Sequence, residues 1–206
     1  MRLYNAMKLS ALAAGTILLF ACSAHAYDHA KYALVLQDIM KFPDQPTKEA
    51  YYAIEDKIEL LRFSYYRPDD QHIILVTSAF LVGAHDRYGW PISGDSQIGK
   101  AALEIISGKG KPAAYLNDDR MVNGTKIELW WMSYFGSQDE AYLFKLLKYA
   151  GDPAPQNPVR ALRVQLASQS FKANCQQIKS VQEFARRVLN DPAYKDRKAF
   201  LLSCLK

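Results

Sequence analysis

Cysteine is scarce in this chain, with three among 206 residues, and ten glycines and nine prolines are too few for a fibrous or low-complexity protein. No apolar run reaches the roughly 20 residues that a membrane-spanning helix needs. Hydrophobic residues nevertheless make up 50% of the chain. So much apolar side chain outweighs the conformational entropy lost on folding, which excludes intrinsic disorder and predicts a globular protein.

The first 26 residues have the pattern of a secretory signal peptide. Two basic residues, Arg2 and Lys8, precede an apolar run of 13 residues, Leu9–Ala21. Ala24-His25-Ala26 then supplies the small-x-small pattern that a signal peptidase cleaves. Met7 begins a more typical signal of this kind and is an alternative start of translation to Met1. We expect a periplasmic or secreted protein, whose mature part, residues 27–206, forms a single domain.

Two other properties follow from this interpretation. Leu19-Phe20-Ala21-Cys22 partly resembles a lipoprotein signal, so a lipid anchor on Cys22 is an alternative to cleavage after Ala26, although Phe20 fits that signal poorly. Cleavage after Ala26 also removes two basic and no acidic residues, which lowers the net charge from +5 to +3. A weakly basic exported protein without runs of basic residues is not expected to bind nucleic acid.

Export changes the interpretation of the two remaining cysteines, Cys175 and Cys204. An even number of cysteines in an oxidising compartment favours a disulfide. Ser180-Val181-Gln182-Glu183 has the form of a capping box that starts a helix, and Pro192 opens another, so the chain is expected to return toward Cys175. A bridge that closes about 29 residues would contribute roughly 3–4 kcal/mol. Two buried free thiols are the alternative.

Helical periodicity dominates the mature chain. The apolar residues Tyr51, Ile54, Ile58, Leu61 and Tyr65 recur at spacings of three and four, as on one face of a helix. No segment alternates with a period of two for long, so no strand is expected. The pattern predicts helices over about 47–67, 71–87, 96–107, 118–135 and 139–150, and further C-terminal helices within 157–206.

Two segments of the chain are similar to each other. Residues 57–66 and 126–135 are identical at six of ten positions, and the register continues to residues 80 and 149. The spacing of 69 residues is about twice the period of helix-turn-helix repeats. We therefore expect antiparallel helix hairpins, with repeat units at about 47–90 and 118–151, stacked into a short α-solenoid. Chance similarity between two amphipathic helices is the alternative.

The segment Trp131–Leu143 resembles exported proteobacterial α-helical proteins of unassigned function, which carry an aromatic pair, a small-residue turn with an acid, and a Tyr-Leu helix start. It is also distantly similar to tetratricopeptide and Sel1-type repeats, although Trp, Gly and Ala do not fall at the spacings of those repeats. The resemblance covers about 25 residues twice. It implies a protein-binding helical scaffold and carries no catalytic residue over to this chain.

No motif in the sequence predicts catalysis, a cofactor or a metal. Gly94–Ala101 matches a phosphate-binding loop except that Ala101 replaces the required Ser or Thr, and no strand precedes it. His72 and His85 lie about 20 Å apart on one expected helix, too far to share a metal ion. Glu55 and Glu59 share a helical face and could act as the acid and base of a cell-wall hydrolase, but a solvated charged face is the simpler interpretation.

The aromatic residues supply the functional hypothesis. Adjacent aromatic pairs cannot all point into one core, so some are expected on the surface, where exposed rings anchor protein or peptide partners. The expected function is non-catalytic binding of a periplasmic protein or peptide, and a secreted inhibitor or immunity-type protein and a cell-wall hydrolase are the alternatives. The predicted partner-binding residues are Tyr65, Tyr66, Trp130, Trp131 and Tyr134.

Overall fold

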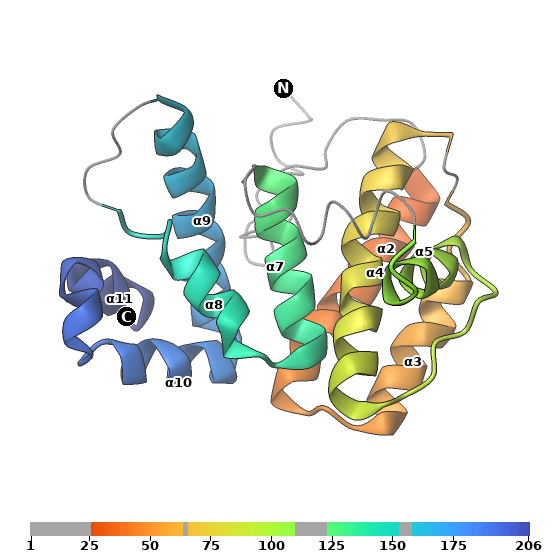
Figure 1. Ribbon diagram of the computed structural model, residues 1–206, viewed down its shortest axis with the longest axis horizontal. Helices are drawn as coiled ribbons and strands as arrows, with labels where there is room; N and C mark the ends of the chain where they lie inside the picture. The colour runs from red at the N-terminus through yellow and green to blue at the C-terminus, as the bar shows by residue number, and fades with distance from the viewer. Residues whose placement is uncertain (1–25, 64–65, 110–122, 153–157) are drawn as a thin grey trace, which may run out of the picture. The chain divides into compact units, whose positions relative to one another are not determined.

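The structure is a computed structural model that describes residues 26–63, 66–109, 123–152 and 158–206, with side chains from Ala30 onward. The described residues form helices and no strand, which confirms the predicted all-α fold (Figure 1). None of these helices combines the length and the apolar character that crossing a membrane requires. The elements are α2 (Ala26–Lys41), the 3-10 helix η1 (Phe42–Asp44), α3 (Lys48–Glu59), α4 (Pro68–Tyr88), α5 (Gln97–Ile106), α7 (Gly124–Ser137), α8 (Glu140–Leu147), α9 (Pro158–Gln177), α10 (Lys179–Val188), the 3-10 helix η2 (Pro192–Arg197) and α11 (Lys198–Cys204).

The chain divides into two compact units. The N-terminal unit contains the described residues of His25–Lys145, and the C-terminal unit contains those of Leu146–Lys206. The boundary falls within α8. Each unit therefore has its own set of packed helices and is described by itself below.

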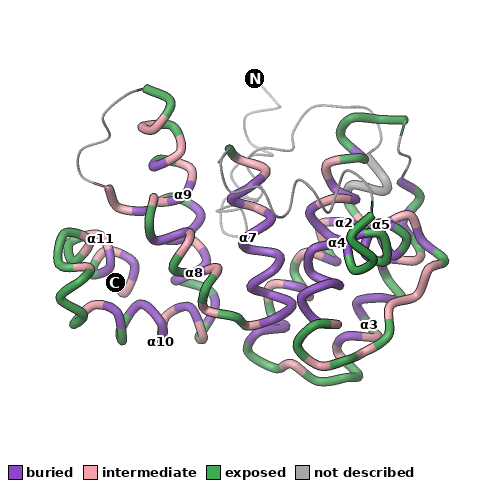
Figure 2. The backbone as a smooth tube through the Cα atoms, in the orientation of Figure 1, coloured by how far each residue is buried: buried purple, intermediate pink, exposed green. Residues whose placement is uncertain are grey.

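The centre of the N-terminal unit is the contact between α4 and α7. Both helices are buried over most of their length, as their colouring in Figure 2 shows. Gly83 on α4 and Gly136 on α7 let the two backbones approach closely. A Cβ atom on Gly136 would lie 2.1 Å from the carbonyl oxygen of Phe80, and one on Gly83 would lie 2.8 Å from that of Ser133. No other residue type fits at these two positions without moving a helix.

Side-chain caps fix where several of these helices begin. The hydroxyl of Thr47 accepts a hydrogen bond from the Ala50 N–H (3.1 Å), Ser96 accepts one from Gly99 (2.9 Å), and Asn123 accepts one from Lys126 (3.0 Å). Each cap satisfies one of the free N–H groups in a first helical turn. Short polar residues before apolar stripes therefore set the starts of α3, α5 and α7.

An aromatic cluster joins η1 to α4 and to the loop after α4. Phe42 lies edge-on to Phe80 (centroid distance 5.3 Å) and to Trp90 (6.1 Å). Trp90 stacks on Tyr88 at 4.3 Å, and the Tyr51 hydroxyl donates a hydrogen bond to the Pro91 carbonyl (3.2 Å). These contacts hold the connection between α4 and α5 against α3 and η1.

The C-terminal unit packs α9, α10 and α11 around phenylalanine rings. Phe171 on α9 contacts Phe184 on α10 (centroid distance 6.3 Å) and Phe200 on α11 (5.9 Å). Phe171 and Phe184 are fully buried. Since each helix contributes one ring to this cluster, the three helices share one apolar core.

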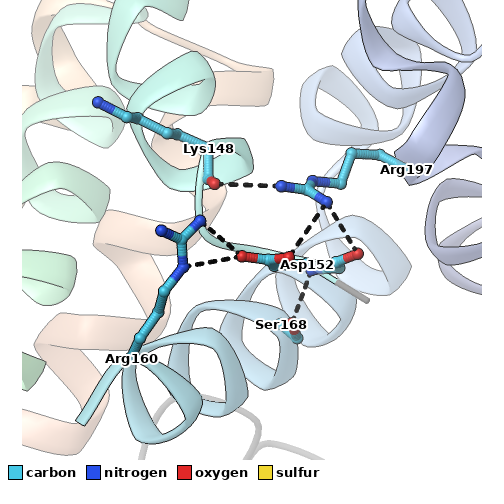
Figure 3. Close-up of polar contacts among 6 residues, drawn as sticks. Lys148, Asp152, Arg160, Ser168 and Arg197 are labelled. Atoms are coloured by element: carbon cyan, nitrogen blue, oxygen red, sulfur yellow. Dashed lines mark hydrogen bonds and ion pairs between the residues drawn. The ribbon is translucent and has the colours of Figure 1, made fainter. Parts of the chain in front are cut away.

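A buried carboxylate ties the segment after α8 to two other parts of this unit (Figure 3). Asp152 accepts hydrogen bonds from Nε and Nη2 of Arg160 at 3.0 and 2.8 Å, and lies 3.8 Å from Nη1 of Arg197. Arg197 also donates to the carbonyls of Gly151 and Lys148, at 3.4 Å each. The carboxylate therefore fixes the start of α9 and the end of η2 to the same turn.

The local structures of the two similar segments differ. Residues 126–135 lie inside α7, whereas the helix that contains Lys57 ends at Glu59 and residues 60–63 are not helical. Pro68 begins α4 instead of ending the preceding helix, because a proline at the first helical position loses no hydrogen bond. The structure thus does not show the predicted repeat or its solenoid arrangement.

One further expectation about a helix boundary is wrong. The residue that precedes α10 is Ile178, so Ser180 lies inside the helix and does not form the predicted capping box. The reason is that α9 and α10 are separated by Ile178 alone, whose N–H donates to the Asn174 carbonyl (2.8 Å). The first described helix, α2, was not predicted.

Candidate functional site

Three of the predicted partner-binding residues lie in the core. Trp130, Trp131 and Tyr134 on α7 are each no more than 4% exposed. Every residue from Leu129 to Ser137 is buried, so α7 presents no outer face over this stretch. The argument that adjacent aromatic residues cannot both be buried was therefore wrong for Trp130 and Trp131, because a helix buried on all sides accepts rings in every direction. In the structure these three rings belong to the packing of α7.

The remaining two aromatic candidates have different outcomes. Tyr66 is 95% exposed and is the most exposed of the large apolar side chains in the described chain. Tyr65 lies outside the described residues. A surface of clustered exposed aromatic side chains is thus not formed by the residues that the sequence analysis selected.

A groove opens instead between α2 and α3. It encloses about 250 Å³. Its floor is apolar, since Phe42 and Ile54 are buried and Ala50 and Ala53 lie beside them on α3. Its rim is polar and mostly exposed. The rim consists of Asp38 and Lys41 on α2, Gln45 and Thr47 before α3, and Lys57 on α3.

The rim of the groove has a positive excess of charge. Oδ2 of Asp38 lies 2.6 Å from Nζ of Lys57, so this carboxylate compensates one of the two lysines. The second, Lys41, stands at the C-terminal end of α2, where a cation interacts favourably with the helix dipole. An apolar floor with a net positive rim suits an apolar side chain that has a carboxylate near it.

The groove was not predicted from the sequence because α2 was not predicted. Asp38 and Lys41 become site residues only once residues 26–41 are assigned to a helix. A signal for that helix is present, because Tyr32, Val35 and Ile39 recur at spacings of three and four and all three are buried. The same stripe continues to Phe42 in the floor of the groove.

A second polar arrangement joins α4 to α7. Nε2 of His72 lies 2.6 Å from Oε2 of Glu128, and Nδ1 of His72 lies 3.4 Å from the hydroxyl oxygen of Thr125. A histidine between a carboxylate and a hydroxyl has the composition of a catalytic triad. This contact is longer than the 2.6–3.2 Å that is usual between a nucleophile and its base. We interpret the arrangement as a polar link between two helices.

The segment that resembles a phosphate-binding loop has a structural role. The Gly99 N–H, which would have to face a phosphate, donates to the hydroxyl of Ser96. A Cβ atom on Gly99 would lie 1.9 Å from the carbonyl oxygen of Ser93, so the glycine allows the loop to cross the start of α5 closely. Among the described residues no group of three His, Cys, Asp or Glu side chains could hold a metal ion.

Glu55 is a buried carboxylate, contrary to the expectation of a solvated face. It is 7% exposed and accepts a hydrogen bond from the Ser93 N–H at 2.6 Å. Burial raises the pKa of Glu55, the Ser93 N–H partly opposes this, and the charges of Glu59 and Asp56 add to the increase. Glu55 therefore holds the loop after α4 in place at the cost of a desolvated charge.

This raised pKa predicts a pH-dependent stability. Because the folded state keeps the Glu55 proton at a higher pH than the unfolded chain does, its contribution to stability is greatest in acid and is lost as the pH rises through the folded-state pKa. Glu55→Gln keeps an acceptor for Ser93 but cannot ionise. Urea unfolding at pH 4 and pH 7 should show the wild type losing stability relative to Glu55→Gln as the pH rises, and the opposite trend would contradict this.

The chain was also compared with known proteins. No protein-family model, no curated protein and no solved structure matches it.

Proposed function

We propose that this chain is an exported helical protein that binds a segment of another protein or a peptide in the groove between α2 and α3. The observation that carries the proposal is the combination of an apolar floor and a polar rim around about 250 Å³. This volume lies below the 300–1,000 Å³ of typical small-molecule sites. It suits one or two side chains of a longer ligand whose remaining surface lies over the rim.

The chemistry of the rim specifies the kind of segment that fits. An apolar side chain that enters the groove would remove the exposed part of the Ala53 side chain from water, as in helix-in-groove recognition. A carboxylate on the same segment would meet Lys41. We therefore infer that the ligand carries an apolar anchor with an acidic residue beside it. The proposal assigns no catalytic residue, and it does not depend on stacked repeat units.

The proposal predicts that filling the groove abolishes binding. Peptides would be selected on the full chain from a displayed library of random sequences, and their affinities measured by fluorescence anisotropy. Ala53→Phe should weaken the selected peptides roughly tenfold or more, because the new ring occupies the space of the anchor. Lys41→Glu should weaken peptides with an acidic residue and reduce the salt dependence of their binding.

Tyr66→Ala is the matched control, since it removes an exposed ring that does not line the groove. It should leave the affinities unchanged. If Ala53→Phe binds like the wild type while its circular dichroism shows a folded protein, the groove is not the binding site. Loss of binding in Tyr66→Ala alone would indicate that the binding site lies at Tyr66, as predicted from the sequence. A tight stoichiometric complex with one enzyme would favour an inhibitor.

A further inference from the structure

The two cysteines of the C-terminal unit lie side by side. Cys175 on α9 and Cys204 at the end of α11 are both buried, at 0% and 2% exposure. The structure records them as free thiols that are hydrogen-bonded to each other. The predicted spatial pairing of these residues is therefore present, whereas the covalent bond itself is not.

The packing of α9 against α11 holds the two sulfur atoms together independently of any bond between them. Phe171 lies one helical turn before Cys175, and Phe200 lies one turn before Cys204. The rings of these two residues contact each other at a centroid distance of 5.9 Å. One turn of α9 contacts one turn of α11 through the phenylalanine rings, and the next turn of each helix carries a cysteine. The contact between the helices therefore brings the two cysteines together.

We propose that Cys175 and Cys204 are oxidised to an intramolecular disulfide that covalently joins α9 to α11. The inference rests on the adjacency and burial of the two thiols and on the expected export of the chain to an oxidising compartment. It is independent of the proposed peptide binding, because the groove lies in the other unit.

The contact between the two thiols changes the pKa of both. The hydrogen bond from the Cys204 thiol lowers the pKa of Cys175, burial opposes this, and the charge of Arg186 adds to the decrease. The same hydrogen bond and burial raise the pKa of Cys204. The thiolate of either cysteine is the nucleophile that reacts with the oxidant.

The oxidant is a disulfide, either of a small thiol or of an oxidoreductase. The thiolate of one cysteine attacks one sulfur of this disulfide, forms a mixed disulfide and releases the first thiolate. The thiol of the other cysteine then loses its proton and attacks the cysteine sulfur of the mixed disulfide, which forms the intramolecular bond and releases the second thiolate. The two protons end on the released thiolates, so one disulfide is reduced to two thiols while two cysteines are oxidised.

The test is to refold the full chain from urea in a mixture of oxidised and reduced glutathione. Refolding gives the oxidant access to sulfur atoms that are buried in the native state. Free thiols would then be alkylated in denaturant, and the linkage mapped by mass spectrometry of proteolytic peptides. The expected result is one linked peptide that contains Cys175 and Cys204. Alkylation of both residues, or linkage of either to Cys22, would overturn the proposal.

A second measurement follows the stability consequence. Reduction of the oxidised chain with a phosphine should lower the midpoint of thermal unfolding of the C-terminal unit by roughly 10 °C or more. The Cys175→Ala/Cys204→Ala variant should show no response to the phosphine, and Cys22→Ser should respond like the wild type. Equal responses of wild type and double variant would contradict the disulfide. Peptide binding in the groove should not change in any of these samples.

Discussion

Gly136→Ala is expected to lower the free energy of unfolding of the N-terminal unit by about 3 kcal/mol or more. The added methyl carbon would lie 2.1 Å from the Phe80 carbonyl oxygen and 2.9 Å from the Ala84 nitrogen. Both are backbone atoms of α4, which cannot turn away as a side chain can. Relief therefore requires α4 and α7 to separate along a buried contact, which costs packing over several turns.

Thermal unfolding followed by circular dichroism measures this effect, with an expected decrease in midpoint of roughly 10 °C. Gly94→Ala is the matched control, because its methyl group would meet a flexible methyl of Leu103 at 3.3 Å. It should remain close to the wild type. A Gly136→Ala midpoint within about 2 °C of the wild type would show that the contact between α4 and α7 is looser than the structure has it.

Trp131→Ala should be similarly damaging, with an expected loss of about 3–5 kcal/mol. The indole is 1% exposed, stacks on Phe135 at 5.6 Å and lies edge-on to Tyr134 at 6.3 Å. Removing it leaves a large cavity that the surrounding rings cannot fill. Chemical denaturation with a fluorescence-independent probe, such as circular dichroism, is the appropriate measurement because the substitution also removes a fluorophore.

Tyr66→Ala serves again as the control, since a side chain that is 95% exposed contributes little burial. Its unfolding free energy should stay within about 0.5 kcal/mol of the wild type. If Trp131→Ala instead kept wild-type stability and lost peptide affinity, the indole would be a surface anchor after all. The comparison therefore separates a core residue from a binding residue by two different readouts.

The sequence predicted the helical fold and several helix boundaries because those depend on local chemistry. The start of a helix near residue 96 and the apolar stripe of α3 are examples, and both are present. The burial of Trp130 and Trp131 depends instead on how many helices pack around α7, which no local sequence pattern predicts. The same holds for Glu55, whose partner Ser93 lies 38 residues further along the chain.

One side of the groove could be predicted from the sequence, and the other was not. Its α3 side could be predicted, since Ile54 lies on the recognised stripe. Its α2 side required attention to a helical pattern directly after the predicted signal peptide, where the expected cleavage after Ala26 draws attention away from the periodicity. The similarity between residues 57–66 and 126–135 led to the prediction of a repeat, which the structure does not show, for a related reason. Leu60 lies just after the end of α3, whereas the corresponding Leu129 lies inside α7, because tertiary contacts override weak local propensity.

The pairing of Gly83 with Gly136 has a consequence for how distant relatives of this chain can be recognised. A protein that has diverged at most positions but retains the α4–α7 crossing must still leave space there for two backbones. Substitution at either position would need a compensating shift of the opposite helix, so the two sites are expected to change together or not at all. A candidate relative without small residues at both positions would therefore not have this close crossing of α4 and α7.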